Sequence, residues 1–198
     1  MDILNLLPHK ANGAIKRLIL FFYKDAFPIF ESSTDSSPEQ EVLIPYCKGI
    51  GIDVGCGSKK THPSAIGIDT TPKGMSGKYG SETRMISNAD ICLSGDNLGI
   101  FADGVFDYVV SRHNLEHYDN PSKVLREWKR VLKKKGILGV VLPDDEALDT
   151  MKLDPTHKHV FTKENFKKVM EEAGGFKILE LKTCIPNWSF VCIAKKVN

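Results

Sequence analysis

The chain has 198 residues, of which 41% are hydrophobic and 26% are charged, a composition that is ordinary for one globular domain with or without an extension. These proportions exclude a collagen-like, a coiled-coil and a wholly disordered chain. The 27 basic and 25 acidic residues leave a formal net charge of +2. A protein that binds nucleic acid mainly through its phosphates carries a clearer basic excess, so nucleic acid is not expected as a partner.

The cysteines and the apolar runs bear on the cellular compartment. The five cysteines are widely spaced and form no C-x-x-C motif, which indicates free thiols in a reducing compartment. The longest apolar runs, 18–23 and 137–142, are far shorter than the ~20 residues that span a bilayer. The first ten residues lack the basic start and the apolar stretch of a signal peptide. We therefore expect a cytoplasmic protein without a transmembrane segment.

Residues 1–48 are expected to form an N-terminal helical extension. Within 11–24, apolar side chains recur at helical spacing and basic side chains flank them. The apolar positions are Ile15, Leu18, Ile19 and Phe22. This helix would pack on the domain, act as a lid, or make weak contact with a partner or a membrane surface. A second, short helix is expected to begin at Pro38 and to run towards Tyr46.

Short apolar runs dominate the rest of the chain. Each is rich in β-branched residues and bounded by turn residues, which predicts a buried strand. The five runs are 49–54, 64–69, 84–90, 105–111 and 136–142.

Two amphipathic helices alternate with these strands. The first begins at Pro121 with Asn120 as its cap. The lysines at 133–135 are expected in its last turn, where the helix dipole favours cations, and Gly136 is expected to supply a left-handed end. The second helix begins after the cap residue Thr162.

The alternation of strand and helix predicts an α/β fold, a Rossmann-like doubly wound sheet that is mostly parallel and has helices on both faces. Two last apolar runs flank a turn at 185–187. They predict a closing hairpin that adds an antiparallel strand.

The sequence D-V-G-C-G at 53–57 follows the first predicted strand, as a loop that holds a nucleoside should. Glycine lets the backbone approach a ligand where a Cβ would clash. Asp69 ends the second strand, where a carboxylate can accept hydrogen bonds from both ribose hydroxyls. Asp90 ends the third run. Because open α/β sheets bind ligands at the carboxyl ends of their strands, Asp53, Asp69 and Asp90 are expected to share one site.

The loop favours one class of cofactor over another. A dinucleotide motif G-x-G-x-x-G would need a glycine where Lys60 stands. Asp53, two residues before the first glycine, would repel a pyrophosphate, but it suits a ligand that carries an ammonium and a sulfonium group. S-adenosylmethionine is such a ligand.

Four motifs in order carry a family resemblance: G-I-D-V-G-C-G-S, I-G-I-D, F-A-D-G-V-F-D-Y-V-V-S-R-H-N-L-E-H-Y-D-N-P and L-R-E-W-K-R-V-L-K-K-K-G-I-L-G-V-V-L-P. Together they resemble the class I S-adenosylmethionine-dependent methyltransferases, in particular the type 11-like branch with an L-E-H signature after the fourth strand. The resemblance covers about residues 49–143. It implies a methyltransferase domain over 49–198 and a seven-stranded sheet with a reversed last strand.

The resemblance also implies roles for single residues. Asp53 would hold the amino group of the cofactor, Asp69 the ribose hydroxyls, and Asp90 the adenine amine, with Asp96 as the competing acid. The complete set implied to bind the cofactor is Asp53, Gly55, Cys56, Gly57, Asp69, Thr70, Asp90, Ile91, Ser111, Arg112 and His113. The chain departs from the family in one respect, because the link from Gly57 to the second strand is too short for the usual first helix.

Four histidines are possible catalytic residues. His113 and His117 follow the fourth strand, and His113 could face the acceptor, whereas the signature residue His117 favours a structural role. The loop at about 142–162 leaves the fifth strand and carries His157 and His159. We interpret it as the wall that binds the acceptor. These histidines could bind a metal with the acids nearby, but a solvated loop is favoured and no metal is expected.

The sequence therefore predicts an enzyme that transfers a methyl group from S-adenosylmethionine to a small-molecule or glycan acceptor, with oxygen as the favoured acceptor atom. Two alternatives remain open. One is an interaction protein with a methyltransferase fold that has lost catalysis, and the other is an NAD(P)-dependent oxidoreductase. The sequence leaves the oligomeric state unknown.

Overall fold

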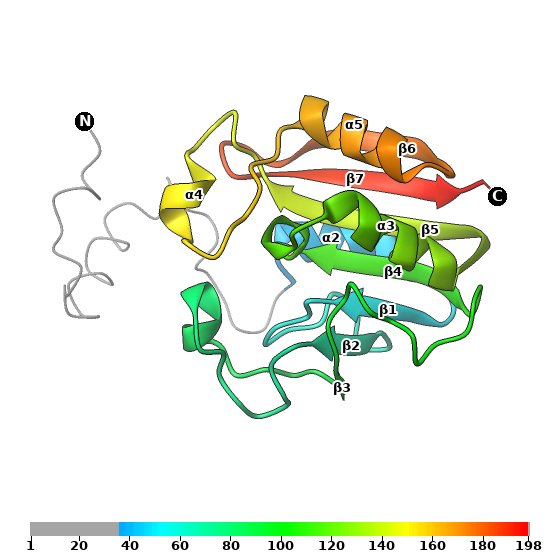
Figure 1. The fold of residues 1–198 in the computed structure, drawn as a ribbon, viewed down its shortest axis with the longest axis horizontal. Coiled ribbons are helices and arrows are strands. Elements are labelled where there is room, and N and C mark those ends of the chain that lie inside the picture. The colour runs from blue at the N-terminus through cyan, green and yellow to red at the C-terminus, as the bar shows by residue number, and fades with distance from the viewer. Residues whose placement is uncertain (1–35, 198) are drawn as a thin grey trace, which may run out of the picture. The chain divides into compact units, whose positions relative to one another are not determined.

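The computed structural model describes residues 36–197, and the residues from Pro38 onwards form one compact unit. In this part of the chain, seven strands make one sheet in the order β3-β2-β1-β4-β5-β7-β6 (Figure 1). The strands are β1 (Gly51–Val54), β2 (Ile66–Asp69), β3 (Ile91–Cys92), β4 (Phe106–Arg112), β5 (Leu132–Pro143), β6 (Phe176–Ile185) and β7 (Ser189–Lys196). The first five strands are parallel to one another, and β7 is antiparallel to both β5 and β6. The predicted Rossmann-like sheet with a reversed last strand is confirmed.

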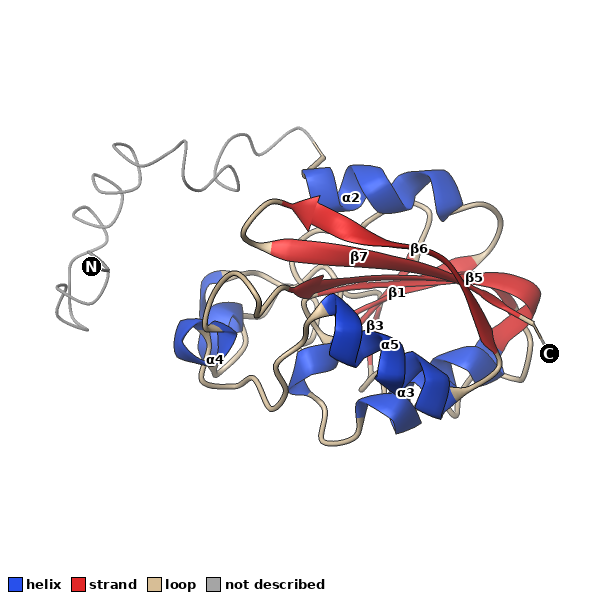
Figure 2. Cartoon of the chain, turned by 90° about the horizontal axis from the view of Figure 1, so that it is seen from above, coloured by secondary structure: helices blue, strands red, loops and turns tan. Residues whose placement is uncertain are grey.

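Helices cover both faces of the sheet, as predicted. The helices are α2 (Pro38–Leu43), η3 (Ile44–Tyr46), η4 (Gly80–Arg84), η5 (Leu115–His117), α3 (Pro121–Val131), α4 (Thr150–Leu153) and α5 (Lys163–Ala173). Figure 2 shows α2 on one face of the sheet and α3 with α5 on the other. Side chains alternate across β4 accordingly. Val109 belongs to the core that contains Trp128 of α3, and Tyr108 and Val110 pack with Leu43 of α2.

The predicted helix starts and the predicted short link are confirmed. Asn120 accepts a hydrogen bond from the backbone N–H of Lys123 at 2.9 Å and so caps α3. Thr162 and Asn165 form a reciprocal capping box at the start of α5. The link 55–65 passes from β1 to the parallel strand β2 without a helix. The loop after β1 therefore shapes the edge of the sheet by itself.

The predicted end of the first amphipathic helix is wrong. Helix α3 ends at Val131, and the lysine run lies in β5, which begins at Leu132. Leu132 is drawn into the sheet because it pairs with Phe106 of β4. Lys133 then forms an ion pair with Asp107 at 2.8 Å. The left-handed residue is Lys135, with a φ of 66°.

The predicted position of the third strand is also wrong. Ile91 and Cys92 form β3 because they pair with Ile68 and Asp69 of β2. Ile86, inside the run expected to be the strand, makes only an isolated bridge and is 58% exposed. Asp90 therefore precedes β3 and does not end it.

The short helix predicted from Pro38 is confirmed as α2 and η3. Its Leu43 is fully buried against the sheet, so this helix packs with the domain, although the sequence-based boundary lies after residue 48. The helix expected at 11–24 lies outside the described residues. Among the described residues, no helix has the length and apolar character needed to cross a membrane.

Candidate functional site

A cavity of ≈ 230 Å³ lies at the carboxyl ends of the central strands. Its walls come from the loop after β1, the end of β2, the segment after β3 and the segment after β4. The predicted site residues that line it are Gly55, Cys56, Gly57, Asp69, Thr70, Arg112, His113 and His117. The predicted site residues outside the lining are Asp53, Asp90, Ile91, Ser111, His157 and His159.

The glycine loop is held open by backbone geometry that only glycine adopts freely. Gly55 and Gly57 have φ values of 70° and 54°, in the left-handed region. A Cβ on Gly55 would lie 2.3 Å from Cγ of Asn114, so this position has no room for a side chain. At Gly57 the nearest atom to such a Cβ is 3.8 Å away, on Met85. The loop therefore presents bare backbone to the cavity.

Asp69 joins the end of β2 to the glycine loop. One carboxylate oxygen accepts the backbone N–H of Gly57 and the other accepts the N–H of Thr71, both at 2.9 Å. A carboxylate oxygen can accept two hydrogen bonds, so each oxygen keeps one acceptor position for a ligand. A fixed pair of acceptor oxygens at the cavity wall suits a vicinal diol such as that of a ribose.

Asp53 lies beneath the loop. It is fully buried. One of its oxygens accepts the backbone N–H of Thr61, and the other has no hydrogen-bond partner among the described residues. Burial raises the pKa of Asp53, against the opposing charge of Arg112. The Arg112 side chain donates to the hydroxyl of Thr61 at 3.0 Å and to the backbone oxygen of Lys59. Asp53 and Arg112 thus fix Lys59 and Thr61, the residues that follow the glycine loop.

Cys56 and Ser111 also belong to this loop and its support. Cys56 lines the cavity, and burial, with the charges of Asp53 and Asp69, raises the pKa of its thiol to about 12. Ser111 is fully buried and donates its hydroxyl to the backbone oxygen of Val54 at 2.8 Å. It therefore braces β1 against β4 at the point where the loop begins.

Asp90 precedes β3 in the sequence, and Asp96 follows it. The Asp90 carboxylate accepts the Lys60 ammonium and the backbone N–H of Gly67, each at 2.8 Å. These contacts lower the pKa of Asp90. Asp96 follows β3, is exposed and accepts the hydroxyl of Ser94 at 2.6 Å. Its neighbour Gly95 lines the cavity.

Gly95 is fixed by two aromatic side chains that the sequence did not mark as part of the site. Its N–H donates to the hydroxyl of Tyr118 at 3.1 Å, and its carbonyl accepts the indole N–H of Trp128 at 2.8 Å. Burial raises the pKa of the Tyr118 hydroxyl to about 12, so it remains a neutral donor and acceptor. A Cβ on Gly95 would lie 2.3 Å from a methyl group of Val54. Leu93, on the same segment, completes this wall.

His113 lines the cavity next to Arg112 and is oriented by α2. Its Nε2 lies 2.8 Å from Oε1 of Glu39, and the same carboxylate accepts the hydroxyl of Ser189 at 2.7 Å. Burial lowers the pKa of His113, but the carboxylates of Glu39 and Glu116 outweigh burial and raise it. The φ of His113 is 47°, a strained value for a residue other than glycine. Glu39 lies 74 positions away in the sequence, so no local pattern could reveal this contact.

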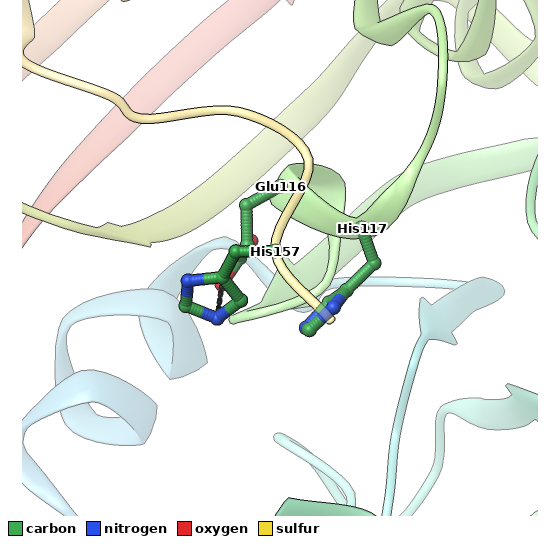
Figure 3. Close-up of side chains that lie close together, drawn as sticks. All are labelled: Glu116, His117 and His157. Atoms are coloured by element: carbon green, nitrogen blue, oxygen red, sulfur yellow. Dashed lines mark ion pairs between the residues drawn. The ribbon is translucent and has the colours of Figure 1, made fainter. Parts of the chain in front are cut away.

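The three histidines that remain differ in position. His117 lines the cavity, and Figure 3 shows it on the same short helix as Glu116, with His157 from the segment after β5 facing both. His157 is half-buried, and its ring lies 4.8 Å from that of His117. His159 is directed away from the cavity lining, with its Nε2 3.2 Å from the backbone oxygen of Asp119.

The segment after β5 folds back over η5. The backbone N–H groups of Lys158 and His159 donate to the carbonyl of Glu116 at 2.8 and 3.2 Å. This segment lies within 142–162, which we interpret from the sequence as the wall that binds the acceptor. It places His157 beside His117, which lines the cavity.

Comparison with known proteins agrees with this fold. Residues 52–140 match the family model of the methyltransferase domain. An uncharacterised protein of Methanocaldococcus jannaschii is 32% identical over 145 residues, which are 70% of this chain and 66% of that protein. The chain thus spans just under two thirds of the length of this relative.

Solved structures share the fold at low sequence identity. One comes from the complex of the Haloferax volcanii Trm112 methyltransferase activator with a proposed methyltransferase (14% identity, TM-score 0.63, 81% of this chain and 89% of that chain). Another is the 1,6-didemethyltoxoflavin-N1-methyltransferase of Burkholderia thailandensis with bound 1,6-didemethyltoxoflavin and S-adenosylhomocysteine (14% identity, TM-score 0.60, 97% of this chain and 91% of that chain).

Sheet order, cavity and family match together define a methyltransferase domain of the Rossmann-like type. In its fold and in the match over 52–140, the chain is similar to the class I S-adenosylmethionine-dependent methyltransferases, enzymes whose cofactor is S-adenosylmethionine. The residues present fit this cofactor: Asp69 offers two acceptor positions for the ribose diol, and the glycine loop leaves its backbone bare. The sheet order, with the antiparallel β7 between β5 and β6, also differs from the classic dinucleotide-binding order 3-2-1-4-5-6.

Proposed function

We propose that this chain transfers a methyl group from S-adenosylmethionine to a hydroxyl group of a small molecule or a glycan. The observation that carries the proposal is that two histidines, His113 and His117, line the same cavity as the glycine loop and Asp69. The bound cofactor supplies a methyl group on a positively charged sulfur. A hydroxyl acceptor needs help with its proton because its pKa is far above neutral, and imidazole rings are suited to that task.

Each wall of the cavity has a role in this proposal. Asp69 accepts the ribose hydroxyls, and the backbone of the glycine loop lies along the methionine part. The segment of Leu93 and Gly95, which Tyr118 and Trp128 hold by hydrogen bonds to Gly95, borders the adenine. Asp96 on this segment is the acid assigned to the adenine amine. Asp90 holds Lys60 and Gly67 in place, a role that would leave it without direct contact to the cofactor. The contacts in the structure support this division, because Asp90 is engaged outside the lining.

The transfer is an in-line displacement. A lone pair of the acceptor oxygen forms the new C–O bond, and the C–S bond breaks with its electron pair remaining on sulfur. The proton of the hydroxyl passes to the imidazole ring of His113, which lines the cavity. The chain contributes alignment and exclusion of water, and the segment at 142–162 is the part that we assign to acceptor binding. We further propose that the protein works in the cytoplasm.

Radiolabel transfer tests the acceptor class. The purified chain is incubated with methyl-labelled S-adenosylmethionine and separate small-molecule, glycan, RNA and protein fractions of a cell extract. We expect label in the small-molecule or glycan fraction, in a product whose label survives mild alkali, as an ether does and an ester does not. Label confined to RNA or protein contradicts the proposed acceptor. The Asp69→Ala variant, which lacks the ribose acceptor, is the negative control.

A further inference from the structure

Glu116 is a buried carboxylate without a hydrogen-bond partner. Its side chain is 0% exposed, and neither carboxylate oxygen accepts a hydrogen bond from the described residues. Leaving a buried carboxylate unsatisfied is expensive, so such a group calls for a specific explanation. The nearest histidine nitrogens do not provide one. Nδ1 of His113 and Nε2 of His157 lie 3.8 and 3.9 Å from Oε1, too far for hydrogen bonds.

Two histidines face this carboxylate. Ligand atoms of Glu116, His117 and His157 all lie within 4.8 Å of one another, and Figure 3 shows the three side chains converging from η5 and from the segment after β5. A tetrahedral site with bonds of ~2.0–2.1 Å has edges of about 3.3 Å. Small side-chain rotations therefore close the group around one ion.

The contacts around His117 orient it as a ligand. Its Nδ1 lies 3.2 Å from the backbone oxygen of Thr156 and 3.1 Å from the Thr156 hydroxyl. A carbonyl oxygen only accepts, so Nδ1 carries the proton and Nε2 keeps its lone pair. Metal-binding histidines are typically held in this way, with the second ring nitrogen donating to a carbonyl or a carboxylate.

We propose that Glu116, His117 and His157 bind one divalent transition-metal ion, Zn²⁺ in the first instance, beside the methyl-donor cavity, and that an oxygen atom of the acceptor occupies an open position on that ion. Two imidazoles and one carboxylate form the ligand set of catalytic zinc sites, which keep a further position open. Mg²⁺ and Ca²⁺ prefer oxygen ligands. The part of the proposal that concerns the acceptor rests on the proposed function.

The structure explains why the ion would lie next to the acceptor. His117 is at once a member of the group and part of the cavity lining, and His157 comes from the segment assigned to acceptor binding. The site thus links the methyl-donor side to the acceptor side. It also differs from the metal alternative weighed from the sequence, which combined His157 and His159 with acids of the loop.

Metal binding is tested on the full chain after dialysis against a chelator. Calorimetry with Zn²⁺ should give one ion per chain, and Co²⁺ should produce the visible absorption bands of a site with four or five ligands. Glu116→Gln and His157→Ala should each weaken Zn²⁺ binding by about 10- to 100-fold or more. His62→Ala, which removes a histidine on the distant 55–65 link, should change it less than about threefold.

Thermal unfolding keeps the test informative if a variant is poorly folded. Zn²⁺ should raise the melting temperature of the wild type, because an ion that binds only the native state stabilises it. Glu116→Gln should melt no lower than the wild type without metal, since it removes a buried carboxylate that accepts no hydrogen bond from the described residues, and it should gain nothing from Zn²⁺. A wild-type chain that binds no Zn²⁺, or a Glu116→Gln chain that binds it equally well, would overturn the metal site.

The role in acceptor binding has a separate readout. Metal-loaded wild type should transfer label to the acceptor, and chelation should abolish transfer while S-adenosylhomocysteine still binds. Transfer that is insensitive to chelation and to Glu116→Gln overturns the acceptor role. If a chain that binds Zn²⁺ and S-adenosylhomocysteine in separate titrations transfers no label from S-adenosylmethionine, the proposed function is refuted, whereas the calorimetry with Zn²⁺ decides the metal site independently.

Discussion

Asp69 is the residue through which the cofactor assignment can be tested most sharply by mutation. Its two oxygens are fixed by the N–H groups of Gly57 and Thr71 at 2.9 Å, and each has one acceptor position left for a ribose hydroxyl. Hydrogen bonds to a charged group contribute about 1.5–3 kcal/mol each. Losing two at the lower value removes about 3 kcal/mol, which corresponds to about a 100-fold weaker affinity.

Asp69→Asn is the suitable change because it keeps the shape, replaces one acceptor oxygen with an NH₂ donor and leaves the other oxygen uncharged, so neither charge-assisted hydrogen bond to the ribose remains. Calorimetry with S-adenosylhomocysteine should show about 100-fold weaker binding. Asp90→Asn is the matched control: it breaks a partly exposed ion pair with Lys60 and should weaken binding by less than about threefold. Circular dichroism confirms that both variants fold. Near-normal binding by Asp69→Asn, with strong loss in Asp90→Asn, would refute the reasoning and restore Asp90 as the acid that binds the cofactor.

Three further predictions follow from the contacts at the site. In a denaturant titration, Gly55→Ala should lose about 1–3 kcal/mol of stability from backbone strain, and more because its Cβ would clash with Asn114. Gly74→Ala has a φ of 81° but open space around it, so it should lose only the stability that backbone strain costs. Equal losses of stability in the two variants would contradict the clash at Gly55. Trp128→Phe should lower the free energy of unfolding by about 1–3 kcal/mol and weaken cofactor binding, because it removes the hydrogen bond to the carbonyl of Gly95. Unchanged cofactor binding would show that this hydrogen bond does not shape the cofactor site. Iodoacetamide at pH 8 should modify exposed Cys92 first and leave Cys56, with its thiol pKa raised to about 12, unmodified in the native chain as judged by mass spectrometry; early loss of the Cys56 thiol would argue against its burial.

The sheet could be predicted because its signals are local. The glycine loop after β1, Asp69 at the end of β2, and the caps Asn120 and Thr162 all depend on residues a few positions apart, and each lies where the pattern indicated. The reversed β7 followed from the resemblance and from the turn at 185–187.

Tertiary pairing overrode local patterns in two places. Strand β3 is set by its register with Ile68, which a weak run at 84–90 could not reveal. Helix α3 ends at Val131, one turn earlier than predicted, because Leu132 pairs with Phe106 of β4. Helix propensity is a weak preference that tertiary context overrides, so the end of a helix beside a strand is difficult to derive from sequence.

The long-range contacts of the site were out of reach of sequence reasoning. The ion pair of Glu39 with His113 joins α2 to the residue that follows β4, and the approach of His157 to Glu116 depends on how the segment after β5 folds back. Asn114 and Tyr118 lie directly before and after the L-E-H motif. This position near the carboxyl end of a strand was the one sequence signal that could have marked them as site residues. That signal does not distinguish a lining residue from a supporting one.

The central claim is that the cavity above β1, β2 and β4 binds S-adenosylmethionine. The most direct measurement is a calorimetric titration of the wild-type chain with S-adenosylhomocysteine, with NADH titrated in parallel. Our account predicts saturable binding of S-adenosylhomocysteine at one site per chain, competed by S-adenosylmethionine, and no binding of NADH. A folded wild-type chain that binds NADH in this cavity and not S-adenosylhomocysteine would contradict the account.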